Sequence, residues 1–150
     1  MVAGGRLWRL LTSAATVYFM KIEHFALQVS DPVAMADWYQ KHLGCDIKRS
    51  SGAPTHQRFL IDSSGSIMLE FYHNPRVPVP DYPSMDPLLV HIAFVSESLE
   101  FDRDRLIKAG AKIADDLITS ASGDQLIMLR DPWGVAVQLV KRAEPMIQAQ

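Results

Sequence analysis

Two histidines, a glutamate and a glutamine occupy matching places in the two halves of the sequence. His24 and Glu70 are 46 residues apart, and His91 and Gln138 are 47 residues apart. Each residue lies in a short apolar segment typical of a strand, where alternate side chains point to the same sheet face. Neutral imidazole and side-chain oxygens suit zinc, nickel, cobalt, manganese or iron as divalent ions, with water in the remaining positions. The four residues therefore predict a divalent metal site.

A metal accounts for all four residues better than a purely structural role does. A lone histidine in a core usually makes a local hydrogen bond. A buried Glu70 without a cation or donor, however, would carry a heavy desolvation cost. If the two halves are related by a pseudo-twofold axis, the two histidines and the two oxygen donors meet on that axis. We therefore expect the four side chains to converge.

The elements that must position these residues occur twice, in the same order. The first half contains a strand, a helix and three strands, in the segments "HFALQVSD", "PVAMADWYQKHLG", "CDIKRSS", "HQRFLIDS" and "SIMLEFYH". The second half repeats that order in "LLVHIAFVSES", "SLEFDRDRLIKAG", "KIADDLIT", "DQLIMLRD" and "VAVQLVKR". Gly44 and Gly110, which end the two helices, follow His24 and His91 by 20 and 19 residues. This register predicts two copies of one βαβββ unit.

The predicted fold is α+β, with two tandem βαβββ modules that form a curved mixed sheet around a metal cleft. The modules span about residues 20–74 and 88–142 of a single domain, residues 20–150. The segment "NPRVPVPDYPSMDP" between them holds five prolines, which favour an extended crossover. Residues 1–19 are expected to be an N-terminal extension with little structure, preceding an internal start at Met20.

Composition excludes several classes of partner. Fifteen basic and seventeen acidic side chains give a formal charge of −2, without the basic cluster that nucleic acids require. The apolar stretch near the N-terminus is interrupted by Arg9 and is too short to span a bilayer. Cys45 is the single cysteine, so no internal disulfide forms, and a reducing cytoplasm is the expected location. We expect a small-molecule substrate, with neither nucleic acid nor membrane as a partner.

The motifs resemble those of the vicinal oxygen chelate superfamily, also described as the glyoxalase, bleomycin resistance protein and dioxygenase superfamily. The resemblance covers about residues 21–142 and rests on the paired modules together with "HFALQV", "MLEFY", "VHIAFVS" and "RDPWG". It implies a divalent metal held by His24, Glu70, His91 and Gln138, and a homodimer, because members of the superfamily commonly pair. One scaffold serves several chemistries in this superfamily, so the resemblance fixes no single reaction.

Within the superfamily, the ligand set is most similar to that of bacterial glyoxalase I, which has His, Glu, His and Glu at these positions. Gln138 is the departure. An amide cannot accept a proton near neutral pH, so Glu70 is expected to be the catalytic base. The resemblance implies a metal-dependent lyase or isomerase of the lactoylglutathione lyase type. Its substrate would chelate the metal through adjacent oxygens.

Further residues are candidates for binding the substrate. Glyoxalases often have an arginine four residues beyond the first ligand, where this chain has Gln28, which weakens the case for a glutathione conjugate. Asn74 matches the asparagine that they often have four residues beyond Glu70. The complete set of candidates is Gln28, Arg58, Tyr72, Asn74, Met128 and Arg130. Surface or turn-bracing roles are the commoner ones for the two arginines.

Two alternatives remain open. A methylmalonyl-CoA-epimerase-like enzyme also combines two His, one Gln and one Glu, but it needs a second acid, for which His56, His73 and Tyr72 are candidates. A non-catalytic resistance or ligand-binding protein would use the same cleft without metal. An extradiol dioxygenase is disfavoured, because those enzymes place a carboxylate where this chain has Gln138. The sequence leaves open the substrate, the metal, the use of glutathione and the oligomeric state.

Overall fold

The computed structural model describes residues 20–146, so the predicted extension over residues 1–19 lies outside the described part of the chain. The first module contains β1 (His24–Gln28), α1 (Pro32–Leu43), β2 (Asp46–Ser50), β3 (Arg58–Ile61) and β4 (Met68–Tyr72). The second contains β5 (His91–Val95), α2 (Leu99–Lys108), β6 (Lys112–Thr119), β7 (Gln125–Arg130) and β8 (Ala136–Lys141). The predicted order, βαβββ followed by βαβββ, is confirmed.

Each module builds one mixed four-stranded sheet. The strand orders are β1-β4-β3-β2 and β5-β8-β7-β6, which match position by position. β1 pairs with β4 in parallel, as β5 does with β8, and the remaining pairs are antiparallel. The α+β class is thus confirmed, with the strands of one chain divided between two sheets. The order brings the first and last strands of each module side by side, which is where the four predicted ligands lie.

The sequence signals at the ends of α1 act as expected. The Asp31 side chain accepts a hydrogen bond from the backbone N–H of Ala34 at 3.0 Å, and Pro32 opens the first turn. Gly44 ends the helix with a φ of +70°, a left-handed conformation that glycine adopts without steric cost. The helix therefore begins and ends at the residues that the sequence signals indicated.

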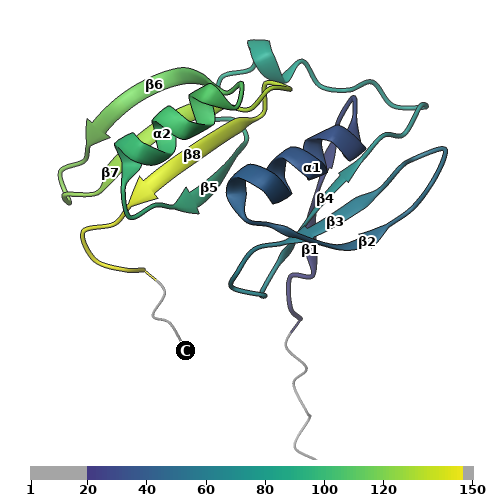
Figure 1. Ribbon diagram of the computed structural model, residues 1–150, viewed down its shortest axis with the longest axis horizontal. Coiled ribbons are helices and arrows are strands. Elements are labelled where there is room, and N and C mark those ends of the chain that lie inside the picture. Colours follow the sequence, from purple (N-terminus) through teal and green to yellow (C-terminus); the bar gives the residue numbers. More distant parts are fainter. Residues whose placement is uncertain (1–19, 147–150) are drawn as a thin grey trace, which may run out of the picture.

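Helix α1 packs against both modules and lies between the two sheets (Figure 1). The Trp38 indole N–H donates to the carbonyl of Ala109 at 2.8 Å, just beyond α2. The Tyr39 hydroxyl donates to the buried carboxylate of Asp131 at 3.0 Å, in the turn before β8. Apolar side chains from the first module and from β8 share one core cluster around Tyr39. The modules are therefore joined through α1.

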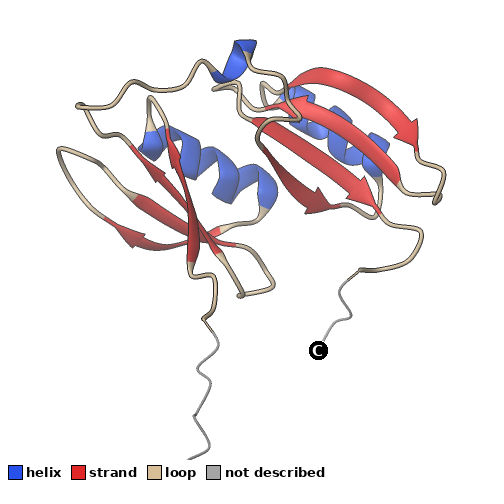
Figure 2. Ribbon diagram, turned by 180° about the vertical axis from the view of Figure 1, so that it is seen from behind, coloured by secondary structure: helices blue, strands red, loops and turns tan. Residues whose placement is uncertain are grey.

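The proline-rich linker runs from one module to the other past a short 3-10 helix, η1 (Tyr82–Ser84), and is seen from behind in Figure 2. The linker was predicted to be extended, and η1 is a departure over three residues. Arg130 fixes η1 by donating to the Tyr82 carbonyl at 2.7 Å and also to the Met85 carbonyl. Among residues 20–146, no helix has the length and apolar character needed to cross a membrane.

Candidate functional site

Each sheet has one face covered by its helix and an opposite face, which we call the open face. In the first module, Leu27, Leu60 and Phe71 are buried in the core beneath α1. Because side chains alternate along a strand, His24 and Glu70 lie on the open face. The register places Ala26 opposite Glu70, so His24 is its diagonal neighbour across the parallel pair. The predicted first half of the site is therefore assembled by the β1–β4 pairing.

His24 and Glu70 face each other directly. His24 Nε2 lies 3.3 Å from Glu70 Oε2, and the two side chains are 37% and 9% exposed. The other ring nitrogen, Nδ1, contacts the Glu23 carboxylate, and the Phe59 ring meets the imidazole edge-on with centroids 5.5 Å apart. The hydrogen bond with Glu23 is the main reason that the pKa of His24 is raised, and the charge of Glu70 adds to it.

The separation of these two atoms fits a pair of ligands on one divalent ion. Ligand bonds of about 2.0–2.2 Å place two ligands about 3.0–3.4 Å apart at angles between a right angle and a tetrahedral one. The nitrogen and the oxygen carry lone pairs, so a cation or a proton between them removes their mutual repulsion. His24 and Glu70 therefore fit as half of a metal site.

The second module repeats this arrangement with an amide in place of the carboxylate. Ala93 is opposite Gln138 across the parallel β5–β8 pair, which makes His91 the diagonal neighbour of Gln138. His91 is exposed, Gln138 is half-buried, and the buried side chain of Met128 lies opposite Gln138 on β7. His91 and Gln138 thus occupy the register positions in the second sheet that His24 and Glu70 occupy in the first.

The expected convergence of all four ligands does not occur within one chain. Across residues 20–146, no three or more His, Cys, Asp or Glu side chains gather closely enough to hold a metal ion. The physical reason is the position of α1. Its residues Trp38, Tyr39 and Leu43 pack against the second module and fill the space between the two sheets. The structure brings His24 to Glu70 but leaves His91 apart from them.

Gln28 and Asn74, two of the substrate-binding candidates, are engaged with each other. The buried Gln28 amide donates to the carbonyls of Asn74 and Val77, both at 2.9 Å, and accepts from the Asn74 N–H at 2.8 Å. The Asn74 side chain accepts from the backbone N–H of Arg76 at 3.0 Å. Both side chains hold the loop after β4, and Tyr72 lies half-buried opposite Gln28.

The two arginine candidates donate to backbone carbonyls. Arg58 donates to the carbonyls of Ser51 and Gln57, both at 2.9 Å, and thereby braces the loop between β2 and β3. Arg130 donates to Tyr82 in the linker and to Gly134 at 3.0 Å. These bonds give both guanidinium groups the turn-bracing role, which the sequence favoured as the commoner one.

His56 and His73 line a cavity of about 290 Å³ near the start of α1, together with Ser30 and Asp31. His73 Nδ1 lies 3.0 Å from the Val29 carbonyl oxygen. Cys45 is buried, and burial raises the pKa of its thiol to about 11, so the thiol stays protonated near neutral pH. Within the described residues, the polar contacts of Glu70 are with Gln57 and His24 and with neither of these histidines.

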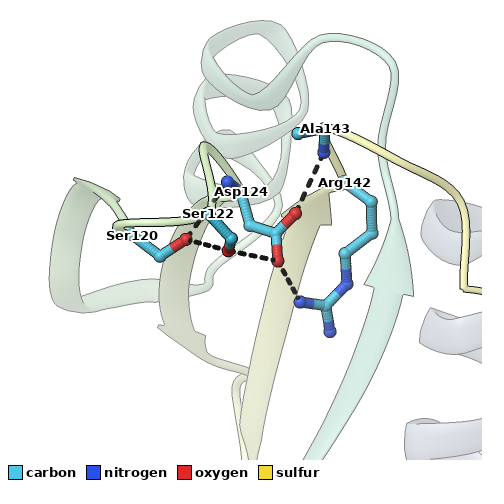
Figure 3. Close-up of polar contacts among 5 residues, drawn as sticks. All are labelled: Ser120, Ser122, Asp124, Arg142 and Ala143. Carbon is cyan, nitrogen blue, oxygen red and sulfur yellow. Dashed lines mark hydrogen bonds and ion pairs between the residues drawn. The ribbon is translucent and has the colours of Figure 1, made fainter.

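A larger cavity, of about 510 Å³, lies against β5 and β8 on the open face of the second sheet, where Ala93, the partner of Gln138, lines it. Its walls include Ala93, Val95 and Val140, and the C-terminal segment closes one side through Met146. Asp124 anchors that segment, as Figure 3 shows: it accepts from the Ala143 N–H at 2.9 Å and pairs with Arg142 at 2.8 Å. The volume is in the range of small-ligand pockets.

Sequence reasoning missed Gln57, which contacts the site directly. Its amide Nε2 donates to Glu70 Oε1 at 2.7 Å. Gln57 lies just before β3, and the loop that precedes it determines whether its side chain reaches the open face. The polar neighbours of Glu70 were therefore not predictable from residue spacing alone.

Comparison with known proteins agrees with this architecture. Residues 21–139 match the profile of the Glyoxalase/Bleomycin resistance protein/Dioxygenase superfamily. A glyoxalase family protein from Enterococcus faecalis is 26% identical, with a TM-score of 0.63 over 83% of this chain and 100% of the other. A mutant glyoxalase I from Zea mays is 20% identical, with a TM-score of 0.65 over 83% of this chain and 46% of the other.

An antibiotic-binding protein from Streptomyces sp. CB03234 is also similar in structure. It is 18% identical, with a TM-score of 0.63 over 85% of this chain and 99% of the other. No curated protein sequence matches this chain. The structural likenesses at these lower identities establish the fold, which enzymes and binding proteins share.

Proposed function

Because this chain belongs to the Glyoxalase/Bleomycin resistance protein/Dioxygenase superfamily, we propose that it is a metal-dependent, glyoxalase-like lyase or isomerase. Its substrate is a small molecule that offers adjacent oxygens to a divalent ion. The observation that carries this proposal is the separation of 3.3 Å between His24 Nε2 and Glu70 Oε2 on an open sheet face. Zinc, nickel, cobalt, manganese and iron all suit this donor set.

The complete site forms in a homodimer. One chain presents His24 with Glu70 on one open face and His91 with Gln138 on another, separated by α1. A second copy that places its own second half-site against the first half-site of this chain supplies the missing two ligands. β1 and β5 are edge strands of their sheets, so their outer edges are available for such an approach. The homodimer and the cytoplasmic location remain predictions.

Glu70 is the proposed catalytic base, and its surroundings suit that role. His24 and Glu70 would hold the divalent ion together with the partner's half-site, and the chemistry it would supply there is polarisation of the substrate oxygens and stabilisation of the negative charge developing on them. Glu70 takes the proton from the substrate carbon and returns it to the adjacent carbon. Its side chain is 9% exposed, which keeps bulk water from competing for that proton. Gln138, an amide, contributes an oxygen but no base.

The environment of Gln28 argues against recognition of glutathione at this position. Its amide is fully occupied by Asn74 and Val77, and it carries no charge. Two substrates therefore need comparison: the hemithioacetal of methylglyoxal with glutathione, and methylmalonyl-CoA for the epimerase-like alternative. Both reactions move a proton next to a carbonyl, and both would depend on Glu70.

Glu70→Gln tests the proposal because it keeps the shape of the side chain and removes the base. We expect turnover of whichever substrate is accepted to fall by about 10²–10⁴-fold, while the folded structure, followed by circular dichroism, is retained. Glu100→Gln, on the exposed first turn of α2, is the matched control and should leave turnover unchanged. Unchanged turnover in Glu70→Gln would refute the assignment.

A metal-free ligand-binding protein is the second candidate, and the cavity of about 510 Å³ against β5 and β8 favours it. A structural neighbour described as an antibiotic-binding protein supports this alternative at the level of fold. Metal analysis of protein purified without chelator separates the two functions. Less than about a tenth of an equivalent of metal, together with failure to bind added Co²⁺, would favour the binding protein.

A further inference from the structure

Two polar side chains, Gln57 and Ser51, continue the hydrogen-bond network behind the open-face carboxylate of Glu70. Gln57 Nε2 donates to Glu70 Oε1 at 2.7 Å. The Ser51 hydroxyl donates to Gln57 Oε1 at 3.3 Å and accepts from the Gln57 backbone N–H at 3.0 Å. The carboxylate of Glu70 only accepts, so the NH₂ end of the Gln57 amide faces it, and the carbonyl end then faces the Ser51 hydroxyl, which can donate to it.

Because of this hydrogen-bond network, the two oxygens of Glu70 have different partners. Oε1 accepts from Gln57, and Oε2 lies 3.3 Å from His24 Nε2. Without a donor at Oε1, the carboxylate is free to rotate about its last bond, since such terminal torsions are broad. A carboxylate held at one oxygen presents the other in a fixed direction.

The second module gives an internal comparison. The sheet registers pair Phe59 with Glu70 and Met128 with Gln138. Two residues before Phe59 stands Gln57, just ahead of β3, and two residues before Met128 stands Leu126, within β7. The module with a carboxylate thus has a hydrogen-bond donor behind it, and the module with an amide has an apolar side chain there.

We infer that Gln57, held in place by Ser51, is a positioning residue that orients Glu70 so that Oε2 faces His24 and the bound ion. This inference rests on the proposed function for the metal, but the orientation of the carboxylate is a property of the metal-free chain as well. Partners that orient metal ligands from behind typically change metal affinity about 10–100-fold when they are removed.

Gln57→Leu is the direct test, because it gives the first module the residue found in the second. Gln125→Leu makes the same change at another half-buried glutamine, at the start of β7 and outside the first half-site. Titration with Co²⁺, followed by visible absorption, should show about 10–100-fold weaker binding and an altered spectrum for Gln57→Leu. Gln125→Leu should bind as the unaltered protein does. Equal affinity and an identical spectrum for Gln57→Leu would overturn the inference.

A metal-free crystal structure of Gln57→Leu separates this inference from the proposed function. We expect the Glu70 carboxylate to rotate, so that Oε2 no longer lies 3.3 Å from His24 Nε2. If the unaltered protein fails to bind Co²⁺, the metal-dependent function is wrong and the crystal structure alone decides: an unmoved carboxylate refutes the positioning role. If Gln57→Leu fails to fold, Ser51→Ala is used instead, since it releases the amide without removing it.

Discussion

The hydrogen bond from Tyr39 to Asp131 should make the stability of this protein depend on pH in a specific way. Asp131 is 3% exposed, and its Oδ2 accepts from the Tyr39 hydroxyl at 3.0 Å. Its Oδ1 accepts from the N–H groups of Trp133 at 2.9 Å and Val135 at 3.0 Å. Burial raises the pKa of Asp131 to about 6, and these hydrogen bonds oppose the rise without cancelling it.

The sign follows from comparing the folded and unfolded chains. Between the usual pKa of 3.8 and about 6, the folded protein holds a proton on Asp131 that the unfolded chain has lost. Asp131 therefore stabilises the fold less as the pH rises through this window, and more as the pH falls through it. A difference of about two pH units corresponds to about 3 kcal/mol.

Tyr39→Phe removes the donor and should cost more when Asp131 is charged. A hydrogen bond to a charged group contributes about 1.5–3 kcal/mol, and one between neutral groups about 0.5–1.5 kcal/mol. We therefore expect a loss of about 2 kcal/mol in the free energy of unfolding at pH 8 and about 1 kcal/mol at pH 5. Because the Tyr39 bond lowers the pKa of Asp131, its removal should also extend the pH-sensitive window upwards.

Urea denaturation at both pH values measures these losses. Tyr82→Phe is the matched control, because its buried hydroxyl donates at 3.0 Å to the uncharged carbonyl of Gln28. Its loss should be the same at pH 5 and pH 8. Equal losses at the two pH values for Tyr39→Phe, parallel to the control, would refute the argument. So would an Asp131→Asn variant whose stability follows the same pH profile as the unaltered protein.

Two further substitutions test the contacts that hold the linker and the C-terminal segment in place. Gly134→Ala should lower the free energy of unfolding in urea by at least about 3 kcal/mol, because φ is +89° and the added Cβ would lie 2.4 Å from Pro83 Cγ. Gly65→Ala is the control. Its φ is +67° with no atom within 4 Å of the added Cβ, so its free energy of unfolding should fall by only about 1 kcal/mol. Asp124→Asn should speed hydrogen exchange of the Ala143 amide several-fold, whereas Asp62→Asn should not. The Ala143 N–H and Arg142 lower the pKa of Asp124, so in the unaltered protein this protection should persist above pH 3.8 and weaken only as the pH falls through the lowered pKa.

The fold was predictable because its signals are local and repeated. Capping residues such as Asp31 and Gly44 mark the helix, and the alternation of apolar residues marks the strands. The approach of His24 to Glu70 was also predictable, since a βαβββ unit that repeats its ligands in its first and last strands implies that those strands are neighbours. Only the module's own topology was needed for that half of the site.

The relation between the modules was not predictable from the same signals. Whether α1 lies outside the two sheets or between them depends on Trp38 and Tyr39 meeting the carbonyl of Ala109 and the carboxylate of Asp131. These partners are 71 and 92 residues away in sequence, so the local spacing of apolar and polar residues does not predict the contacts. The role of Arg130 was not predictable for the same reason. Its acceptors lie in the distant linker and give it a structural role that residue type alone left open.

The two modules have the same topology but differ in the polarity of their open faces. This difference favours separate roles in proton transfer and in ligand binding. The first module surrounds a carboxylate with a histidine and an amide donor, which favours a fixed charge and proton transfer. The second has a cavity of about 510 Å³ with both apolar and charged walls against β5 and β8, which favours holding an organic ligand. A homodimer that joins unlike half-sites would therefore put the base of one copy beside the ligand pocket of the other. In that arrangement, mixing Glu70→Gln subunits with His91→Ala subunits should restore one intact site per heterodimer, whereas sites complete within one chain would stay inactive in the mixture.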